Sequence, residues 1–349
     1  MNTPMNPAHC SRAVATTLWT LMAVLTTLGA AEAQTTLPPA QPSAWAAPTG
    51  PFRVVMEEAE ALVDHTIYRP EELVALATGQ RLPIVAFAGP GCDANGTAFR
   101  PFFTELASHG FLVIVSGAPE PRGGSGPNFP KTAPADLVAS IDWAVAEGGR
   151  AGSRFSGRID PERVAVMGQS CGGAQSLSIA DDPRVDTIVL WNSTSFLSGP
   201  TGRGRGSARA PAQVAGTPNA PDGREGRGAR GGRGGGIPVP AVDPSLLQKL
   251  RVPVAYFIGG EKDILYGGAV ADIATFESAP LFWASTNLAG PDPHAGTFRE
   301  KNGGVFGVVG VAWLKWRLQG DPQAARLFEG AACTLCVDPV WDVRKKNMD

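Results

Sequence analysis

The residues best suited to covalent chemistry are 168–173, which read Gly-Gln-Ser-Cys-Gly-Gly. An apolar run, 164–167, precedes them, and a stretch of helical composition, 174–180, follows. A Gly-x-Ser-x-Gly sequence between a buried strand and a helix predicts a nucleophile elbow. In this sharp turn the serine takes a strained backbone conformation with its Oγ exposed. The pattern therefore favours Ser170 as a nucleophile over an ordinary glycine-rich turn.

A serine nucleophile needs a base, and the sequence offers four histidines. The serine hydroxyl reacts poorly until a base takes its proton, and a carboxylate in turn orients that base. His9, His65 and His109 precede Ser170, whereas His294 follows it in a loop rich in glycine, proline and aspartate. Because the chain order of such triads is serine, acid, histidine, we expect His294 to be the base rather than an ordinary surface residue.

The acid is expected between the serine and the histidine. Residues 259–263, Gly-Gly-Glu-Lys-Asp, follow a predicted strand, and a carboxylate just past the carboxyl end of a strand faces the same crevice as the elbow. Asp263 is the preferred acid, and Glu261 is the alternative. Asp272 is expected to face solvent on the next helix, and Asp292 lies too close to the histidine in sequence to orient it easily.

The negatively charged oxygen of a tetrahedral intermediate needs two N–H donors. The amide after the nucleophile, that of Cys171, is expected to be one of them. The other should come from the turn after the predicted strand 83–88. Pro90 in that turn has no N–H, so Cys92 is the preferred donor and Gly91 the alternative.

Apolar strands alternate with helical stretches along the body of the chain. The expected strands are residues 54–56, 62–68, 83–88, 111–116, 164–167, 187–191, 252–258 and 281–285. The expected helices are residues 98–109, 133–147, 173–180 and 303–318. This alternation predicts an α/β fold with a mostly parallel central sheet and helices on both faces.

These motifs together resemble the α/β-hydrolase superfamily, in particular the group of dienelactone hydrolases, chlorophyllases and cutinase-like polyester hydrolases. The resemblance spans roughly residues 52–318. It rests on Gly-Pro-Gly-Cys at 89–92, on the elbow, on Gly-Glu-Lys-Asp at 260–263 and on the loop of His294. It implies an α/β-hydrolase fold and a serine hydrolase that needs no metal and no organic cofactor.

The oxyanion hole has a consequence for two cysteines. If the amides of Cys92 and Cys171 bind one oxyanion, their Cα atoms come within the roughly 4.4–6.8 Å that a disulfide spans. We therefore expect a Cys92–Cys171 disulfide that holds the two halves of the hole together. The alternative is two small residues that pack without a bond.

Two residues are expected to bind substrate. Gln169 stands where the resembling polyester hydrolases carry Trp or His, and Trp191 ends a strand on the side of the sheet that carries the elbow. For Trp191, and still more for Trp283, the alternative is a place in the core.

The outer segments differ from the body in composition. Residues 1–33 combine Arg12, an apolar run and a final Ala-Glu-Ala, which predicts a signal peptide. Residues 34–50 are rich in Pro, Ala and Gln and are expected to form a flexible leader, followed by a hydrolase domain at 51–349. Within it, residues 199–236 hold seven arginines and two acidic residues, and they are expected to be a disordered insertion or mobile flap.

Charge and cysteine content narrow the choice of partners. The chain carries a net charge of −2 although the arginine-rich insertion is basic, so its body is mildly acidic and gives no reason to expect a nucleic acid. No segment after the signal peptide has the roughly 18 consecutive apolar residues of a transmembrane helix.

Cys333 and Cys336 have the spacing of half a zinc site, but the other half is missing. They are expected to form a local disulfide or to remain two thiols.

The residues thus predict an exported serine hydrolase that cleaves carboxylic esters, is secreted or periplasmic, and acts as a monomer on a small or polymeric ester. A peptidase or an acyltransferase with the same mechanism is the first alternative. The second is a non-catalytic binding protein on a hydrolase scaffold, with the arginine-rich insertion contacting an anionic polymer or a cell surface.

Overall fold

The computed structural model describes residues 48–59, 61–119, 129–195 and 242–348. The predicted signal peptide, residues 34–47 of the predicted leader and the predicted insertion at 199–236 lie outside these described residues. Residues 48–50 of the leader are ordered against the body, since the backbone N–H of Thr49 donates to the buried Glu105 carboxylate at 2.9 Å.

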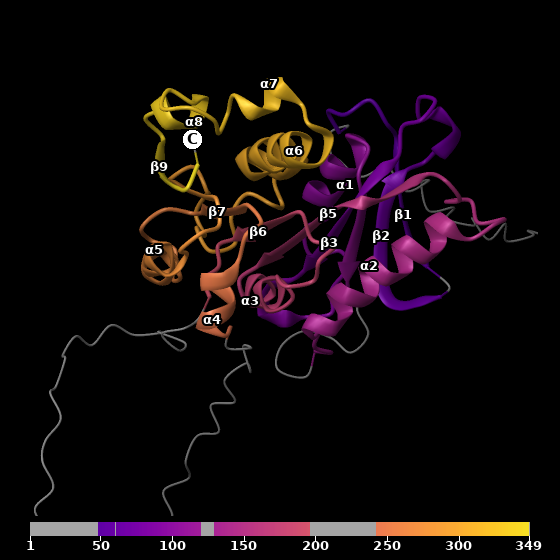
Figure 1. Cartoon of the computed structure of the whole chain (residues 1–349), viewed down its shortest axis with the longest axis horizontal. Helices are drawn as coiled ribbons and strands as arrows, with labels where there is room; N and C mark the ends of the chain where they lie inside the picture. Colours follow the sequence, from indigo (N-terminus) through magenta and orange to yellow (C-terminus); the bar gives the residue numbers. More distant parts are fainter. Residues whose placement is uncertain (1–47, 60, 120–128, 196–241, 349) are drawn as a thin grey trace, which may run out of the picture. The chain divides into compact units, whose positions relative to one another are not determined.

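A nine-stranded sheet runs through the described part of the chain (Figure 1). Its strands are β1 (Val54–Ala59), β2 (Leu62–Pro70), β3 (Leu82–Ala88), β4 (Leu112–Ser116), β5 (Ile159–Gln169), β6 (Thr187–Trp191), β7 (Val254–Ile258), β8 (Leu281–Thr286) and β9 (Trp341–Lys346). The strand order is β1-β2-β4-β3-β5-β6-β7-β8-β9. Strands β4, β3, β5, β6, β7 and β8 are parallel to their neighbours in this series, whereas β1, β2 and β9 add antiparallel edges. The predicted mostly parallel sheet is confirmed.

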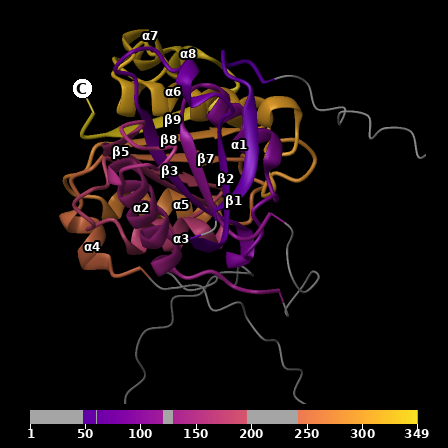
Figure 2. The same cartoon turned by 90° about the vertical axis from the view of Figure 1, so that its right-hand side faces the viewer.

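Helices cover both faces of the sheet. They are α1 (Arg100–Ser108), α2 (Pro134–Gly149), α3 (Cys171–Ser178), α4 (Pro244–Lys249), α5 (Tyr266–Thr275), α6 (Gly304–Gln319), α7 (Pro322–Ala325) and α8 (Thr334–Val337), with short 3-10 turns η1 (Leu73–Ala75), η2 (Pro90–Cys92) and η3 (Lys301–Gly303). Figure 2 shows α6, α7 and α8 on one side of the strands and α2, α3, α4 and α5 on the other.

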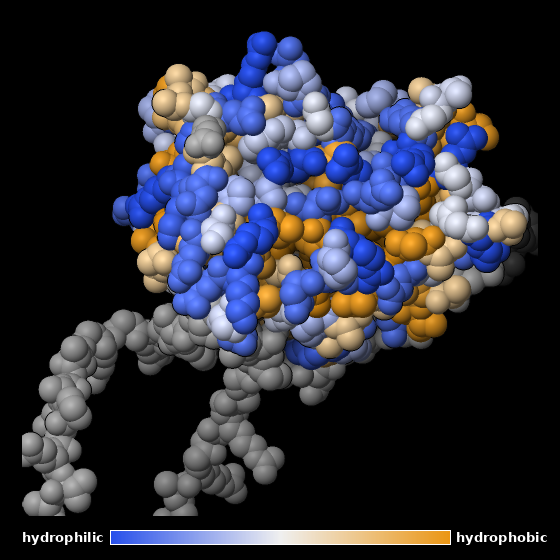
Figure 3. Space-filling model, viewed as in Figure 1, coloured by the Kyte–Doolittle hydropathy of each residue, from blue (hydrophilic) through white to orange (hydrophobic). Residues whose placement is uncertain are grey.

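Two apolar clusters, one on each face, hold these layers to the sheet. One joins α2 and α3 to the strands through residues such as Leu137 and Leu177, and the other joins α1 and α6 through residues such as Phe102 and Val309. The central strands are buried along their whole length, as expected where helices cover both faces. A band of apolar side chains crosses the middle of the face seen in Figure 3, between the α1–α6 layer and the α2–α3 layer. None of the helices in the described segments is long and apolar enough to cross a membrane.

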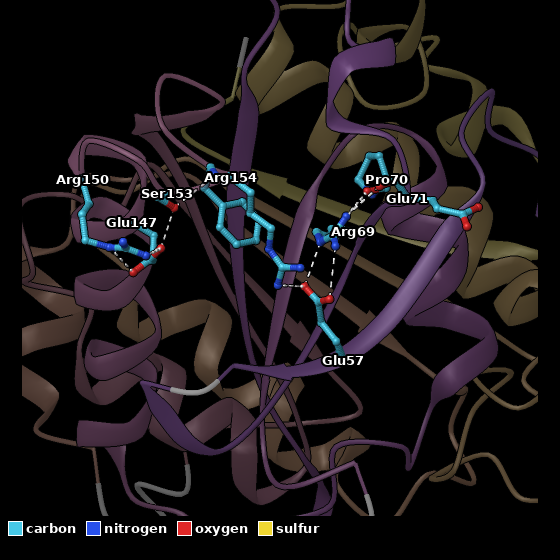
Figure 4. Close-up of polar contacts among 9 residues, drawn as sticks. Glu57, Arg69, Pro70, Glu71, Glu147, Arg150, Ser153 and Arg154 are labelled. Carbon is cyan, nitrogen blue, oxygen red and sulfur yellow. Dashed lines mark hydrogen bonds and ion pairs between the residues drawn. The ribbon is translucent and has the colours of Figure 1, made fainter.

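A buried ion pair ties the first two strands to the loop that follows α2 (Figure 4). Arg69 on β2 donates to both carboxylate oxygens of Glu57 on β1, at 2.8 and 3.1 Å. Arg154 donates to the same carboxylate, and both guanidinium groups lie over the ring of Phe155. Arg69 is only 6 % exposed, so this carboxylate offsets the cost of burying its charge.

Replacing Glu57 by glutamine is expected to lower the free energy of unfolding by about 2 kcal/mol, because it leaves a buried guanidinium without its counter-charge. Urea denaturation of the two proteins measures the difference. Glu147→Gln is the matched control, since its partner Arg150 is exposed and the loss should be much smaller. Equal losses of unfolding free energy in the two variants would contradict the stabilising role of the Glu57–Arg69 ion pair.

Candidate active site

The three predicted triad residues and Cys92 follow the carboxyl ends of parallel strands. Cys92 follows β3, Ser170 follows β5, Asp263 follows β7 and His294 lies in the loop after β8. Because neighbouring parallel strands end at the same edge of the sheet, these residues, distant in sequence, meet in one place.

Ser170 occupies the strained turn between β5 and α3. Its φ is 54° and its ψ is −120°, a backbone conformation that a side-chain-bearing residue rarely adopts. A Cβ on Gly168 would overlap the carbonyl of Gly172, and a Cβ on Gly172 would overlap the carbonyl of Ala88 at the end of β3. The glycines of the motif are therefore required by close backbone approach, and Ser170 is placed as in a nucleophile elbow.

Ser170, His294 and Asp263 form one hydrogen-bonded chain. Ser170 Oγ lies 3.0 Å from His294 Nε2, and His294 Nδ1 lies 2.8 Å from Asp263 Oδ1. A carboxylate only accepts hydrogen bonds, so Nδ1 carries the proton and Nε2 is free to accept from the serine hydroxyl. The Asp263 side chain is fully buried, whereas that of His294 is 23 % exposed. The imidazole can therefore be reached from outside while the carboxylate orients it.

The other carboxylates considered from sequence do not contact the imidazole. Glu261 is exposed, and Asp292 is exposed and accepts a bond from the backbone of Ala295 at 3.2 Å. Asp272 contradicts the expectation that it faces solvent, because it is 4 % exposed.

Asp272 is the acceptor of a buried polar cluster near the site. It accepts from the hydroxyl of Thr194 at 2.7 Å, from the backbone and hydroxyl of Ser195, and from the hydroxyl of Tyr256 at 3.1 Å. Burial raises the pKa of Asp272, and the hydrogen bonds from Ser195, Thr194 and Tyr256 partly oppose the rise. The cluster fixes the segment that leaves β6, which lies beside β5 and the elbow.

The two halves of the predicted oxyanion hole are covalently joined. Cys92 and Cys171 form a disulfide with a Cα–Cα distance of 5.2 Å, and both are buried. This confirms the predicted bond. Cys171 is the first residue of α3, where a backbone N–H has no acceptor within the helix. Cys92 has a φ of 52° and Gly91 a φ of 62°, so the chain after β3 turns sharply next to the elbow.

The second cysteine pair also forms a disulfide, Cys333–Cys336, which is the first of the two alternatives that the sequence left open. No group of three or more His, Cys, Asp and Glu side chains within the described residues is arranged to hold a metal ion.

Neither of the two residues expected to bind substrate is exposed. Trp191 is fully buried and packs on the rings of Phe102, Phe257, Phe298 and Phe306. It therefore takes the alternative place in the core, as does the fully buried Trp283.

Gln169 is 1 % exposed, and its side-chain amide donates to the backbone carbonyl of His294 at 2.7 Å rather than facing outward. Its burial leaves little surface for a substrate to touch, and its contact is with the main chain of the histidine loop.

Sequence reasoning missed Asn192. Its side-chain amide donates to the same His294 carbonyl at 2.9 Å and to that of Pro293 at 3.1 Å. Asn192 follows β6 directly, and its φ of 43° falls in the left-handed region that asparagine tolerates better than most residues. A polar residue immediately after a buried strand was the available signal.

The sheet topology, the helices on both faces and the elbow after β5 define the class: the chain has an α/β-hydrolase fold. Residues 29–201 match the family model of PET hydrolase-like proteins. The resemblance to the cutinase-like polyester hydrolases is thereby confirmed. The matched range contains the Cys92 turn and the elbow, while Asp263 and His294 lie beyond it.

Individual cutinases of Thermobifida are similar over a shorter stretch. Cutinase est1 of Thermobifida alba is 30% identical over 137 residues, which are 38% of this chain and 41% of that protein. Cutinase 2 of Thermobifida cellulosilytica is 30% identical over 137 residues, covering 38% of this chain and 47% of the relative. Cutinase cut1 of Thermobifida fusca is also 30% identical over 137 residues, and this stretch covers 38% of each of the two proteins. The similarity thus spans less than half of the length of these relatives.

Proposed function

We propose that this protein is an exported serine hydrolase that cleaves carboxylic esters. The observation that carries the proposal is the chain of hydrogen bonds from Ser170 Oγ through His294 to Asp263. Ser170 lies in a strained turn at the carboxyl end of β5. The similarity to PET hydrolase-like proteins and to cutinases supports an ester as the substrate class.

The proposed reaction has two steps. Ser170 Oγ attacks the acyl carbon while His294 Nε2 takes its proton, and the amides of Cys171 and Cys92 stabilise the oxyanion of the tetrahedral intermediate. Collapse of the intermediate breaks the ester bond, and the imidazolium gives its proton to the leaving alcohol. Water, deprotonated by the same imidazole, then attacks the acyl-serine, and the imidazolium returns the proton to Ser170 Oγ as the acid leaves. Asp263 stabilises the imidazolium throughout.

Export is part of the proposal. The composition of residues 1–33 supports a signal peptide, and two disulfides suit an oxidising compartment such as the periplasm or the extracellular medium. We propose that residues 199–236 are not needed for hydrolysis of small esters.

The proposal is tested at Ser170. A fluorophosphonate probe is expected to label the wild type but not Ser170→Ala, and the variant should lose at least about 10⁴-fold in kcat on p-nitrophenyl esters. Ser156→Ala is the matched control because that serine is exposed in the loop before β5, at the opposite end of that strand from the elbow. Unlabelled wild-type protein, or labelling that survives Ser170→Ala, would rule the proposal out.

A further inference from the structure

The backbone carbonyl of His294 accepts two side-chain amides. Gln169 Nε2 donates to it at 2.7 Å and Asn192 Nδ2 at 2.9 Å, and Asn192 also donates to the neighbouring carbonyl of Pro293 at 3.1 Å. A carbonyl oxygen has two lone pairs, so both are used at His294. We call Gln169 and Asn192 together the amide clamp.

Both donors of the clamp are held by the sheet. Gln169 is the last residue of β5, and its register partner on β6 is Trp191, the residue just before Asn192. The backbone N–H of Asn192 donates to the carbonyl of Phe257 on β7 at 2.9 Å. With exposures of 1 % and 0 %, the two side chains have almost no freedom to move.

The segment that they hold has no regular structure of its own. Residues 287–297 belong to no helix or strand, and turn contacts to Asp292, from Gly296 N at 3.1 Å and Ala295 N at 3.2 Å, stay inside the loop. The clamp therefore ties the loop to the sheet at the histidine itself. A shift of the loop would carry the imidazole with it.

The clamp also has a free-energy cost, and packing alone does not explain why polar side chains stand at these two positions. The amide oxygens of Gln169 and Asn192 are buried and have no partner among the described residues. Turning either amide over would face an oxygen against the carbonyl of His294, so the donors must point at the loop. Apolar side chains would avoid the two unpaired acceptors, which argues that the donors serve the histidine.

We propose that Gln169 and Asn192 are positioning residues that hold His294 Nε2 on Ser170 Oγ through the main chain of the loop. The inference rests on the proposed function of the Ser170–His294 pair. The clamp touches neither the serine nor the acyl group, and it acts on the geometry of proton transfer. A misplacement of about 1 Å in such a group costs about 100-fold in rate.

The test uses Gln169→Met, Asn192→Gly and the double variant. Methionine keeps the length of the side chain, and glycine tolerates the positive φ, so each change removes mainly the donor. We expect kcat to fall by about 10-fold to 100-fold in each single variant, with KM unchanged within about twofold on esters of different chain length. The double variant should fall little further than the worse single variant, because both donors serve one carbonyl.

Asn347→Gly is the matched control. Asn347 also has a positive φ, of 56°, and its side-chain amide also donates to two backbone carbonyls, those of Glu277 and Ala279. These contacts lie before β8, at the opposite end of that strand from the His294 loop. This variant should keep kcat within about twofold, and titration with the fluorophosphonate probe counts the folded active sites in every preparation.

A second readout does not depend on turnover. The Nδ1 proton that His294 donates to Asp263 is expected to give a downfield proton resonance in the wild type, and exchange should broaden it beyond detection in the double variant. If the variants keep both the wild-type kcat and this resonance, Gln169 and Asn192 are not positioning residues. A rise in KM that differs between esters, with kcat unchanged, would overturn it in favour of substrate binding by Gln169. If the wild type hydrolyses no ester, the proposed function fails, whereas the resonance still decides on the clamp.

Discussion

Replacing Asp263 by asparagine is expected to lower kcat on p-nitrophenyl esters by about 10⁴-fold while leaving the fold intact. The Asp263 carboxylate accepts the Nδ1 proton of His294 at 2.8 Å and also a backbone N–H from Leu265 at 2.9 Å. Both hydrogen bonds go to the same oxygen, Oδ1, so an asparagine with its carbonyl oxygen in that place would keep them. The neutral amide would bring no negative charge to stabilise the imidazolium that forms when His294 takes the proton of Ser170.

Glu261→Gln is the control for this prediction. Glu261 is two residues from Asp263, follows the same strand and is exposed, so its loss should change kcat by less than about threefold. Steady-state kinetics with circular dichroism spectra of both variants separates a chemical defect from an unfolded protein. If Glu261→Gln were the inactive variant and Asp263→Asn the active one, the acid would be misassigned.

The second large effect is expected from removing the Cys92–Cys171 disulfide. The bond joins residues 79 positions apart, and in the chain-entropy account a loop of that length stabilises the folded state by about 4 kcal/mol. The double variant Cys92→Ala/Cys171→Ala should show this loss in urea denaturation. It should also lose activity, because the two proposed oxyanion donors are then no longer held in register.

The activity loss has a defined origin. The donors are backbone amides, which alanine retains, so any change in kcat reports their placement rather than their removal. Deleting a donor outright costs about 10²- to 10³-fold, so we expect between about 10-fold and 100-fold here. The matched control is Cys333→Ala/Cys336→Ala, which opens a loop with a sequence separation of only 3. It should cost about 2 kcal/mol and leave kcat unchanged. Wild-type kinetics in the Cys92→Ala/Cys171→Ala variant would contradict the role of the bond.

Local features of the chain were predictable because their causes are local. The elbow depends on glycines at 168 and 172, whose missing side chains permit contacts that any Cβ would block, so the motif carries its own structure. Most strand and helix positions followed from runs of apolar residues between turns. Strand β9 was not expected, because its sequence Trp-Asp-Val-Arg-Lys-Lys is charged and pairs with only one neighbour at the sheet edge.

Side-chain directions at the ends of buried strands were not predictable. Trp191 and Asn192 are adjacent, yet one packs into an aromatic cluster and the other reaches a loop about a hundred residues further along the chain. In a parallel sheet covered on both faces, alternation of apolar and polar residues no longer tells which side of the sheet a residue faces. Asp272, on helix α5, was expected in solvent but lies in a buried cluster, because its partners Thr194 and Tyr256 come from other segments that the pattern of the helix does not reveal.

The amino-acid sequence by itself determined the α/β class, the elbow at Ser170, and the choice of Asp263, His294, Cys92 and Cys171 as candidates, because chain order and backbone sterics restrict these positions. Only the tertiary structure decided that the side chain of Gln169 is buried and donates to the main chain of the histidine loop. That contact joins residues 125 positions apart, and no local preference of either segment encodes it. It exists because the sheet brings the ends of β5, β6 and β8 to one edge.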